Sequence, residues 1–143
     1  MVCLQETRAQ PEQRKAPEFS PEGYQTYYVD AERKGYSGVA IYSRSEPDRV
    51  TEGLGWKAFD REGRWVQADY GRLSVVSVYM PSGTSGDERQ DFKYRIMKKM
   101  KPLLKGFVNG ERDYILCGDF NIAHKEIDIK NWRGNRKNSG FLP

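Results

Sequence analysis

Residues 114–121 read Tyr-Ile-Leu-Cys-Gly-Asp-Phe-Asn, a short apolar run that stops at a glycine and then presents an aspartate and an asparagine. The run 114–117 has the composition of a β-strand, and Gly118 would let the backbone turn at its end. Asp119 and Asn121 lie two residues apart, so an extended backbone would point both side chains to one side. A carboxylate beside a neutral amide suits a phosphoryl-binding site, because the carboxylate can hold a hard cation while the amide donates hydrogen bonds. A strand followed by an Asx-rich turn is the alternative interpretation.

Length and composition describe a charged globular chain. The 143 residues suffice for one domain or part of one, with 37% hydrophobic and 31% charged residues. Lys and Arg number 24 against 20 Asp and Glu, a net charge of +4 that favours a polyanionic partner such as nucleic acid. Cys3 and Cys117 lie in apolar runs without the spacing of a zinc or redox motif, so we expect free thiols in a reducing compartment. No apolar run has the length needed to cross a bilayer, which places the protein in the cytoplasm.

Short strands and one long helix are predicted along the chain. Apolar or alternating runs between Gly, Pro and charged turns predict strands at residues 2–4, 24–29, 38–43, 65–70, 73–79 and 114–117. Their close succession predicts a largely antiparallel sheet. A helix is predicted over 87–107, where apolar side chains recur at spacings of three and four residues: Phe92, Ile96, Met100, Leu103 and Phe107. Pro102 removes a backbone hydrogen bond and predicts a kink or break near Lys101.

Three further segments carry side chains that suit the same chemistry. Glu6 follows the first strand and would supply a carboxylate to a metal site, with an exposed loop acid as the alternative. Tyr79 ends a strong strand before a Pro-Ser-Gly turn and can hydrogen-bond a phosphate, although aromatic caps on sheet cores are commoner. Residues 131–138 combine basic and aromatic side chains with three asparagines, which fits a nucleic-acid backbone. A solvated basic loop is the alternative for this segment.

Taken together, these segments resemble the exonuclease III family of AP endonucleases, within the endonuclease/exonuclease/phosphatase superfamily. The resemblance covers nearly the whole chain and rests on residues 4–7, 34–40, 78–81, 118–121 and 131–142. The Glu-bearing and Gly-Asp-x-Asn motifs occur across the superfamily, which also holds sphingomyelinases and inositol-phosphate phosphatases. The Gly-Tyr-Ser-Gly and Lys-Asn-Ser-Gly-Phe motifs narrow the resemblance to the DNA-repair branch.

The resemblance implies an α+β fold, the α/β sandwich of deoxyribonuclease I-like four-layer proteins. Residues 1–143 would be a partial copy, with a mainly antiparallel sheet and one long helix. Family members begin with a strand ending in Asn-Gly and a first helix, and they continue into a C-terminal sheet with a further catalytic aspartate and a Ser-Asp-His motif. We therefore expect a partial domain that lacks these parts and supplies about one of two sheets. His124 lies just after Asn121 and is interpreted as a loop residue.

The same resemblance assigns roles to individual residues. The catalytic residues would be Tyr79 at the scissile phosphate, Asp119 orienting or deprotonating the attacking water, and Asn121 stabilising the pentacovalent transition state. The metal ligands would be Glu6, Asp119 and Asn121, holding Mg²⁺ with Mn²⁺ as a substitute. The residues implied to touch the DNA backbone are Tyr36, Ser82, Asn131, Asn135 and Asn138.

The function implied by the resemblance is DNA repair. It implies a Mg²⁺-dependent nuclease that hydrolyses double-stranded DNA 5′ to abasic sites and acts as a 3′–5′ exonuclease, with this chain inactive or nearly so by itself. We expect a cytoplasmic, bacterial-type, nucleoid-associated protein without a membrane partner, able to self-associate through the exposed sheet of the fragment. Two alternatives stay open, a non-catalytic nucleic-acid-binding fragment and a superfamily phosphatase acting on a small or lipid phosphoester.

Overall fold

The computed structural model describes residues 1–142, and Pro143 lies outside the described residues. The strands are β1 (Val2–Gln5), β2 (Gln25–Val29), β3 (Val39–Ser43), β4 (Arg49–Glu52), β5 (Trp65–Tyr70), β6 (Leu73–Tyr79) and β7 (Asp113–Asp119). The α-helices are α1 (Lys57–Asp60), α2 (Asp87–Asn109) and α3 (Trp132–Asn135). Three short 3-10 helices cover Gln13–Lys15, Pro17–Phe19 and Glu126–Asp128.

The chain forms two compact units. The first contains residues 1–79 and 107–119, and it holds every strand. The second contains residues 80–106 and the chain from Phe120 onward. The chain passes from the first unit to the second directly after Tyr79 and again directly after Asp119.

Most predicted strands are confirmed. β5 and β6 occupy the predicted ranges 65–70 and 73–79 without change, and β1, β2 and β3 differ from prediction by one residue. β7 is longer than predicted, since it begins at Asp113 and continues through the glycine to Asp119. β4 and α1 were not predicted, because each is four residues long and carries charged residues rather than an apolar run.

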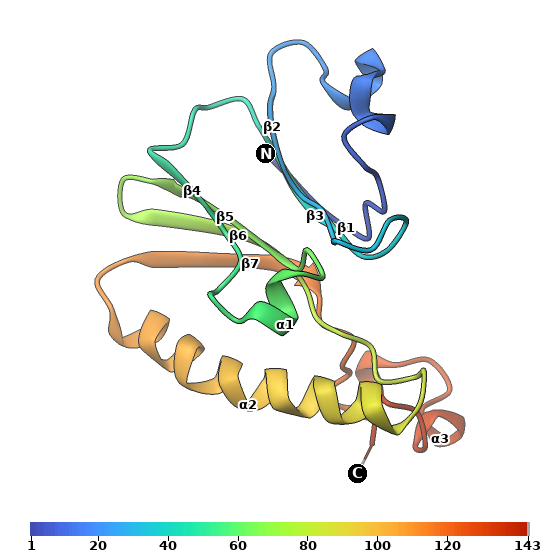
Figure 1. Ribbon diagram of the computed structural model, residues 1–143. Coiled ribbons are helices and arrows are strands. Elements are labelled where there is room, and N and C mark those ends of the chain that lie inside the picture. The colour runs from blue at the N-terminus through green and yellow to red at the C-terminus, as the bar shows by residue number, and fades with distance from the viewer. Residues whose placement is uncertain (143) are drawn as a thin grey trace. The chain divides into compact units, whose positions relative to one another are not determined.

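The strands form two sheets, which corrects the expectation that this segment supplies about one. The first sheet has the order β1-β3-β2 and the second the order β4-β5-β6-β7, as Figure 1 shows. All pairs are antiparallel, as predicted, except β6 with β7. A parallel pair needs a long crossover connection, and α2 lies in the sequence between these two strands. Parallel pairing brings the C-terminal ends of β6 and β7 to the same edge of the sheet.

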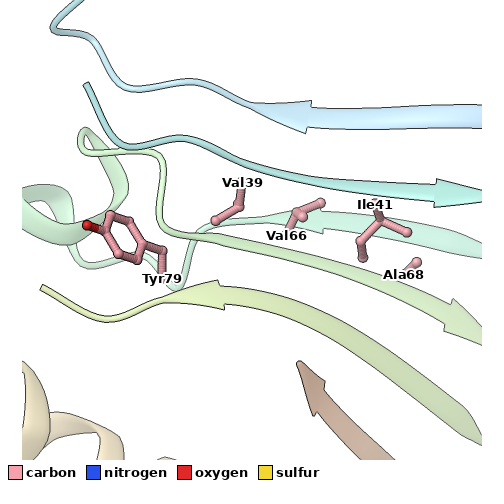
Figure 2. Close-up of a cluster of buried hydrophobic side chains, with 5 residues drawn as sticks. All are labelled: Val39, Ile41, Val66, Ala68 and Tyr79. Carbon is pink, nitrogen blue, oxygen red and sulfur yellow. The ribbon is translucent and has the colours of Figure 1, made fainter. Parts of the chain in front are cut away.

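The hydrophobic core lies between the two sheets. Val39 and Ile41 of β3 meet Val66 and Ala68 of β5, with Tyr79 at one end of the cluster (Figure 2). All five residues of β3 are buried, because this strand lies in the middle of its sheet. Full burial of a valine or isoleucine side chain contributes about 1.5–3 kcal/mol, so this cluster helps to hold the two sheets together.

Helix α2 is longer than predicted and is not interrupted. Phe92, Ile96 and Met100 are buried, which confirms the predicted apolar face. Pro102 lies inside the helix, which continues to Asn109, so the predicted break is wrong. The last turns are held by packing within the first unit, where the ring of Phe107 stacks on Tyr114 with centroids 3.8 Å apart. A bend at Pro102 stays a prediction.

Two sequence-based expectations about the chain as a whole can be compared with the structure. Both cysteines are free, as predicted, and both are partly buried. None of the helices within residues 1–142 combines the length and the apolar character that a membrane-crossing helix requires.

Asp69 organises a buried polar network at the far end of β5. Its carboxylate is only 5% exposed and lies among hydrogen-bond donors on three neighbouring segments. The donors are Gln67 Nε2 at 2.8 Å, Ser74 Oγ at 2.6 Å and Arg49 Nε at 3.0 Å, and Arg112 Nη2 forms an ion pair with the carboxylate at 3.4 Å. Burial by itself would raise the pKa of Asp69, but these donors outweigh it and hold the pKa below its ordinary value.

We predict that Asp69→Asn lowers the free energy of unfolding at pH 7 by about 2 kcal/mol, because buried donors lose a charged acceptor. The folded-state pKa is depressed, so the contribution of Asp69 is present above the unfolded pKa and is lost as pH falls through the folded one. The difference between Asp69→Asn and the parent should therefore narrow as pH falls below 3.8. Urea unfolding at several pH values measures it. Asp113→Asn, at an exposed carboxylate, is the matched control, and an equal effect there would contradict the prediction.

Candidate active site

The end of β1 is tied directly to β6. Gln5 Nε2 donates to Ser77 Oγ at 2.9 Å, and Ser77 Oγ donates to the carbonyl of Leu4, also at 2.9 Å. These cross-sheet hydrogen bonds hold the chain beside β6 just before Glu6, which adopts a left-handed backbone with φ of 53°. The carboxylate of Glu6 is thereby directed to the end of β6.

Glu6, Tyr79 and Asp119 come together at these strand ends. Tyr79 and Asp119 are register partners in the parallel β6–β7 pair. The Tyr79 hydroxyl donates a hydrogen bond to Glu6 Oε1. Asp119 is exposed and lies near enough to contribute to the electrostatic environment of the Tyr79 phenol. We call these three residues the carboxylate–tyrosine cluster.

Gly118 has a different role from the predicted turn. It lies within β7 opposite Val78, and a Cβ atom at this position would lie 2.1 Å from the Val78 carbonyl oxygen. Glycine is therefore required because the two strands approach closely. The chain leaves extended geometry after Asp119, and Asn121 has a left-handed backbone with φ of 53°. The prediction that Asp119 and Asn121 point to one side assumed an extended backbone through both residues. Because Asn121 is not extended, this assumption does not hold.

The cluster holds one ionised acid and one neutral phenol at neutral pH. The hydrogen bond from Tyr79 lowers the pKa of Glu6, and the nearby Arg8 guanidinium, 3.1 Å from Glu6 Oε1, lowers it further. Burial raises the pKa of Tyr79 to about 12, together with its hydrogen bond to Glu6 and the charges of Glu6 and Asp119. Tyr79 can therefore donate a hydrogen bond to an anionic oxygen without itself becoming charged.

Arg64 supports the cluster and was not found from the sequence. Its side chain is 2% exposed, and its guanidinium donates to the Tyr79 carbonyl at 3.0 Å and to the Tyr36 hydroxyl at 3.1 Å. Glu62 accepts from Arg64 Nε at 2.7 Å and balances the buried charge. One feature of the sequence could have indicated its role, namely that Arg64 directly precedes the apolar strand β5. A permanently charged side chain that is buried in a core needs several hydrogen-bond acceptors.

The Gly-Tyr-Ser-Gly segment packs against the chain that follows Glu6. The amide of Arg8 donates to the Ser37 carbonyl at 2.8 Å. A Cβ at Gly38 would lie 2.3 Å from Thr7 Oγ1, so only glycine permits this approach. This packing places Tyr36, one of the predicted DNA contacts, beside Arg64 and in the same unit as the carboxylate–tyrosine cluster.

Asn121 belongs to the second unit. Its side-chain amide donates to the carbonyl of Met80 at 3.0 Å, so the residues after β6 and after β7 contact each other there. Ser82 lies in the loop that follows Met80, where its hydroxyl is 3.0 Å from Thr84 Oγ1. His124 is exposed and lies outside helices and strands, which confirms its interpretation as a loop residue.

The three remaining predicted DNA contacts lie in one loop, which we call the asparagine loop (residues 131–138). Asn131 has a left-handed backbone and precedes the short helix α3. Asn135 Nδ2 donates to the Lys130 carbonyl at 2.9 Å, and Asn138 donates to the side-chain oxygen of Asn135. These two amides therefore shape the loop. Arg133 and Arg136 both lie over the ring of Trp132, with guanidinium carbons 4.6 Å from its centroid, so the loop presents two cations.

The acidic side chains of the cluster suit a hard metal ion better than zinc. Within residues 1–142, no three His, Cys, Asp or Glu side chains gather closely enough to hold a metal by themselves. Mg²⁺ needs only one or two carboxylates, since it keeps several waters and takes further oxygens from a phosphate. The ionised Glu6 and the exposed Asp119 are oxygen donors of this kind, and both lie near a phenol that can donate to anions.

Known proteins are similar to this chain in sequence and in fold. The sequence profile of the endonuclease/exonuclease/phosphatase family matches residues 1–142. An exodeoxyribonuclease from Bacillus subtilis is 40% identical over 143 residues, covering 99% of this chain and 54% of that protein. The DNA repair nuclease APEX1 from Danio rerio is 39% identical over 145 residues, covering 100% of this chain and 46% of that protein.

Solved structures agree with these sequence matches. An AP endonuclease from Archaeoglobus fulgidus superposes with a TM-score of 0.83 at 27% identity, covering 98% of this chain and 54% of that one. The 3′ phosphatase NExo from Neisseria, bound to a product DNA hairpin, gives 0.78 at 25% identity, covering 93% and 51%. These matches confirm the expected deoxyribonuclease I-like fold as a partial copy. The chain spans about half the length of the relatives it matches.

We predict that Glu6→Gln lowers the pKa of Tyr79 from about 12 toward its ordinary value of 10.0. The substitution removes the charge and the strong acceptor that favour the neutral phenol, so the phenolate forms at lower pH. Titration of ¹³Cζ-labelled tyrosines by NMR measures this, with Tyr79→Phe assigning the signal. Glu52→Gln, at the end of β4, is the control. An unchanged Tyr79 titration in Glu6→Gln would show that the two side chains are not coupled.

Proposed function

Because this chain belongs to the endonuclease/exonuclease/phosphatase family, we propose that the protein is a DNA-repair nuclease of the exonuclease III type. It would hydrolyse phosphodiesters 5′ to abasic sites and remove nucleotides from 3′ ends. The observation that carries the proposal is the carboxylate–tyrosine cluster, in a chain that is 40% identical to an exodeoxyribonuclease. Two acids and a neutral phenol that meet where the ends of two sheets come together suit the hydrolysis of an anionic phosphodiester.

The proposal includes a divalent metal. The family generally depends on divalent metal ions, and Glu6 with Asp119 supplies the hard oxygen donors that would hold Mg²⁺, or Mn²⁺ in its place. Asn121 would contribute an amide oxygen as a further ligand. A bound ion would supply neutralisation of the phosphate charge, which lowers the repulsion met by an incoming nucleophile.

The protein's own residues would orient the reacting groups. The Tyr79 hydroxyl, now donating to Glu6, would donate to a phosphate oxygen and remain neutral because its pKa is about 12. Asp119 would accept a hydrogen bond from the attacking water and align it with the phosphorus. The side-chain amide of Asn121 would donate to the oxygens that gain charge in the transition state. In-line attack would then leave a 3′ hydroxyl.

Duplex DNA is the proposed partner. The net charge of +4 and the paired cations of the asparagine loop support binding to phosphates. Tyr36, Ser82, Asn131, Asn135 and Asn138 would contact the DNA backbone. The related NExo structure contains a product DNA hairpin. A nuclease with this substrate would work in the cytoplasm beside the nucleoid.

In the protein at its natural length, we predict that Asp119→Asn lowers incision of a duplex carrying a tetrahydrofuran abasic site by about 10²- to 10⁴-fold, because it removes the carboxylate that orients water. Gel assays with Mg²⁺ or Mn²⁺ and with chelator measure the rate. Asp91→Asn, an exposed acid on α2, is the matched control.

The same assay separates the alternatives. Full activity in Asp119→Asn would contradict the proposed mechanism. Salt-dependent duplex binding without cleavage, weakened by Arg136→Ala, would indicate a binding module. Release of phosphate from inositol phosphates would indicate a phosphatase. The near-inactivity of these 143 residues alone stays a prediction, which the assay tests when the chain is used by itself.

We also propose that this chain self-associates through its exposed sheet surface. Val2 and Leu4 on β1 and Ile115 on β7 are exposed apolar side chains, and both strands are edge strands. Sedimentation velocity should show a mass that rises with concentration. Ile115→Lys should reduce association, whereas Tyr94→Lys, equally exposed on α2, should not. A monomer at all concentrations would refute the proposal.

A further inference from the structure

Lys93 of α2 is a buried lysine in the second unit. Lysine side chains of helices usually face solvent, but Lys93 is only 1% exposed. An ammonium group taken out of water is costly unless its donors are satisfied. A lysine kept at such a position therefore has a specific set of acceptors.

Its acceptors lie on two segments that are far apart in the sequence. Lys93 Nζ donates to the carbonyl of Asn121 at 2.8 Å, to the carbonyl of Ser139 at 3.0 Å and to Ser139 Oγ at 3.2 Å. These are short, charge-assisted hydrogen bonds, roughly twice as strong as neutral ones. One side chain thus joins the residue implied to stabilise the transition state to the residue that follows the asparagine loop.

The surrounding backbone segments are joined to one another by hydrogen bonds and by a close approach at Gly140. The amide of Ala123 donates to the Gly140 carbonyl at 2.9 Å, and a Cβ at Gly140 would lie 2.9 Å from the Asn121 carbonyl oxygen. On the other side, the amide of Gly83 donates to Ser139 Oγ at 3.0 Å. Lys93 therefore lies where three chain segments meet: the loop after Met80, the loop after Asp119 and the end of the asparagine loop.

These hydrogen bonds around Lys93 hold the backbone of Asn121. Asn121 has a left-handed φ of 53°, a conformation that asparagine adopts more readily than most residues but that still needs support. The Lys93 ammonium binds its carbonyl, and the Asn121 side-chain amide donates to the Met80 carbonyl. With both ends held, the direction of the amide is set before any substrate binds. Such preorganisation lowers the barrier for groups that stabilise a transition state.

We propose that Lys93 is a positioning residue for Asn121 and couples it to the asparagine loop through Ser139. This role rests on the proposed nuclease function, because it assigns Asn121 to the reaction. Lys93 itself would touch neither DNA nor metal. Its loss should therefore act on turnover more than on binding, whereas loss of an asparagine-loop cation should act on binding.

The test compares Lys93→Met, which keeps the aliphatic chain, with Lys98→Met, at an exposed lysine five residues further along the same helix. In the protein at its natural length, Lys93→Met should lower kcat on abasic-site duplex by about 10- to 100-fold while KM changes less than about threefold. Hydrogen exchange at the amides of Ala123 and Gly83 should become faster in Lys93→Met and stay unchanged in Lys98→Met. Ser139→Ala, which removes one acceptor and leaves the charge satisfied by the two carbonyls, should show the same pattern with a smaller fall in kcat.

The outcomes distinguish this inference from the proposed function. An unmodified protein without cleavage of any duplex would refute the nuclease proposal. Unchanged exchange at Ala123 and Gly83 in Lys93→Met would overturn the positioning role alone. The positioning role would also be overturned if Ser139→Ala and Lys93→Met both fold and both retain the parental kcat. If Lys93→Met does not fold, Ser139→Ala decides the matter by its kcat and its exchange at Gly83.

Discussion

The hydrogen bond from Tyr79 to Glu6 joins the ends of two sheets and determines how this molecule can act. Glu6 follows β1 in one sheet, and Tyr79 ends β6 in the other. The bond requires the two sheets to pack closely, which the buried side chains of β3 and β5 achieve. Parallel pairing of β6 with β7 then adds Asp119 beside Tyr79. An acid, a phenol and a second acid meet because of the packing of the whole first unit.

Buried cations maintain the backbone next to the predicted catalytic residues. Arg64 binds the Tyr79 carbonyl in the first unit, and Lys93 binds the Asn121 carbonyl in the second. A buried charge is destabilising by itself, so each is retained with several acceptors around it. Arg64 acts through a rigid planar fork with Glu62 as its counter-ion, and Lys93 acts as a point charge among carbonyl and hydroxyl oxygens. Each charged side chain thus holds a backbone carbonyl in place.

Much of the fold could be predicted because its elements carry strong local patterns. The apolar runs of β5 and β6 and the periodic face of α2 predicted those elements closely. The break at Pro102 was wrong because one proline removes a single backbone hydrogen bond, and the other hydrogen bonds of this 23-residue helix remain. Arg64 and Lys93 were missed because charged residues in a local pattern indicate a surface, and burial depends on partners that are distant in sequence.

The sequence by itself determined which reactive side chains this protein carries: an acid after the first strand, a tyrosine at a strand end and the Gly-Asp-Phe-Asn segment, in a chain that matches the endonuclease/exonuclease/phosphatase family. Only the tertiary structure decided that one chain segment supplies two sheets, that Tyr79 pairs with Asp119, and that Asn121 leaves extended geometry. A local sequence pattern indicates which residues face solvent and which face the core. Strand partners and left-handed turns are instead chosen by the free energy of packing the whole chain, which no short window of sequence contains.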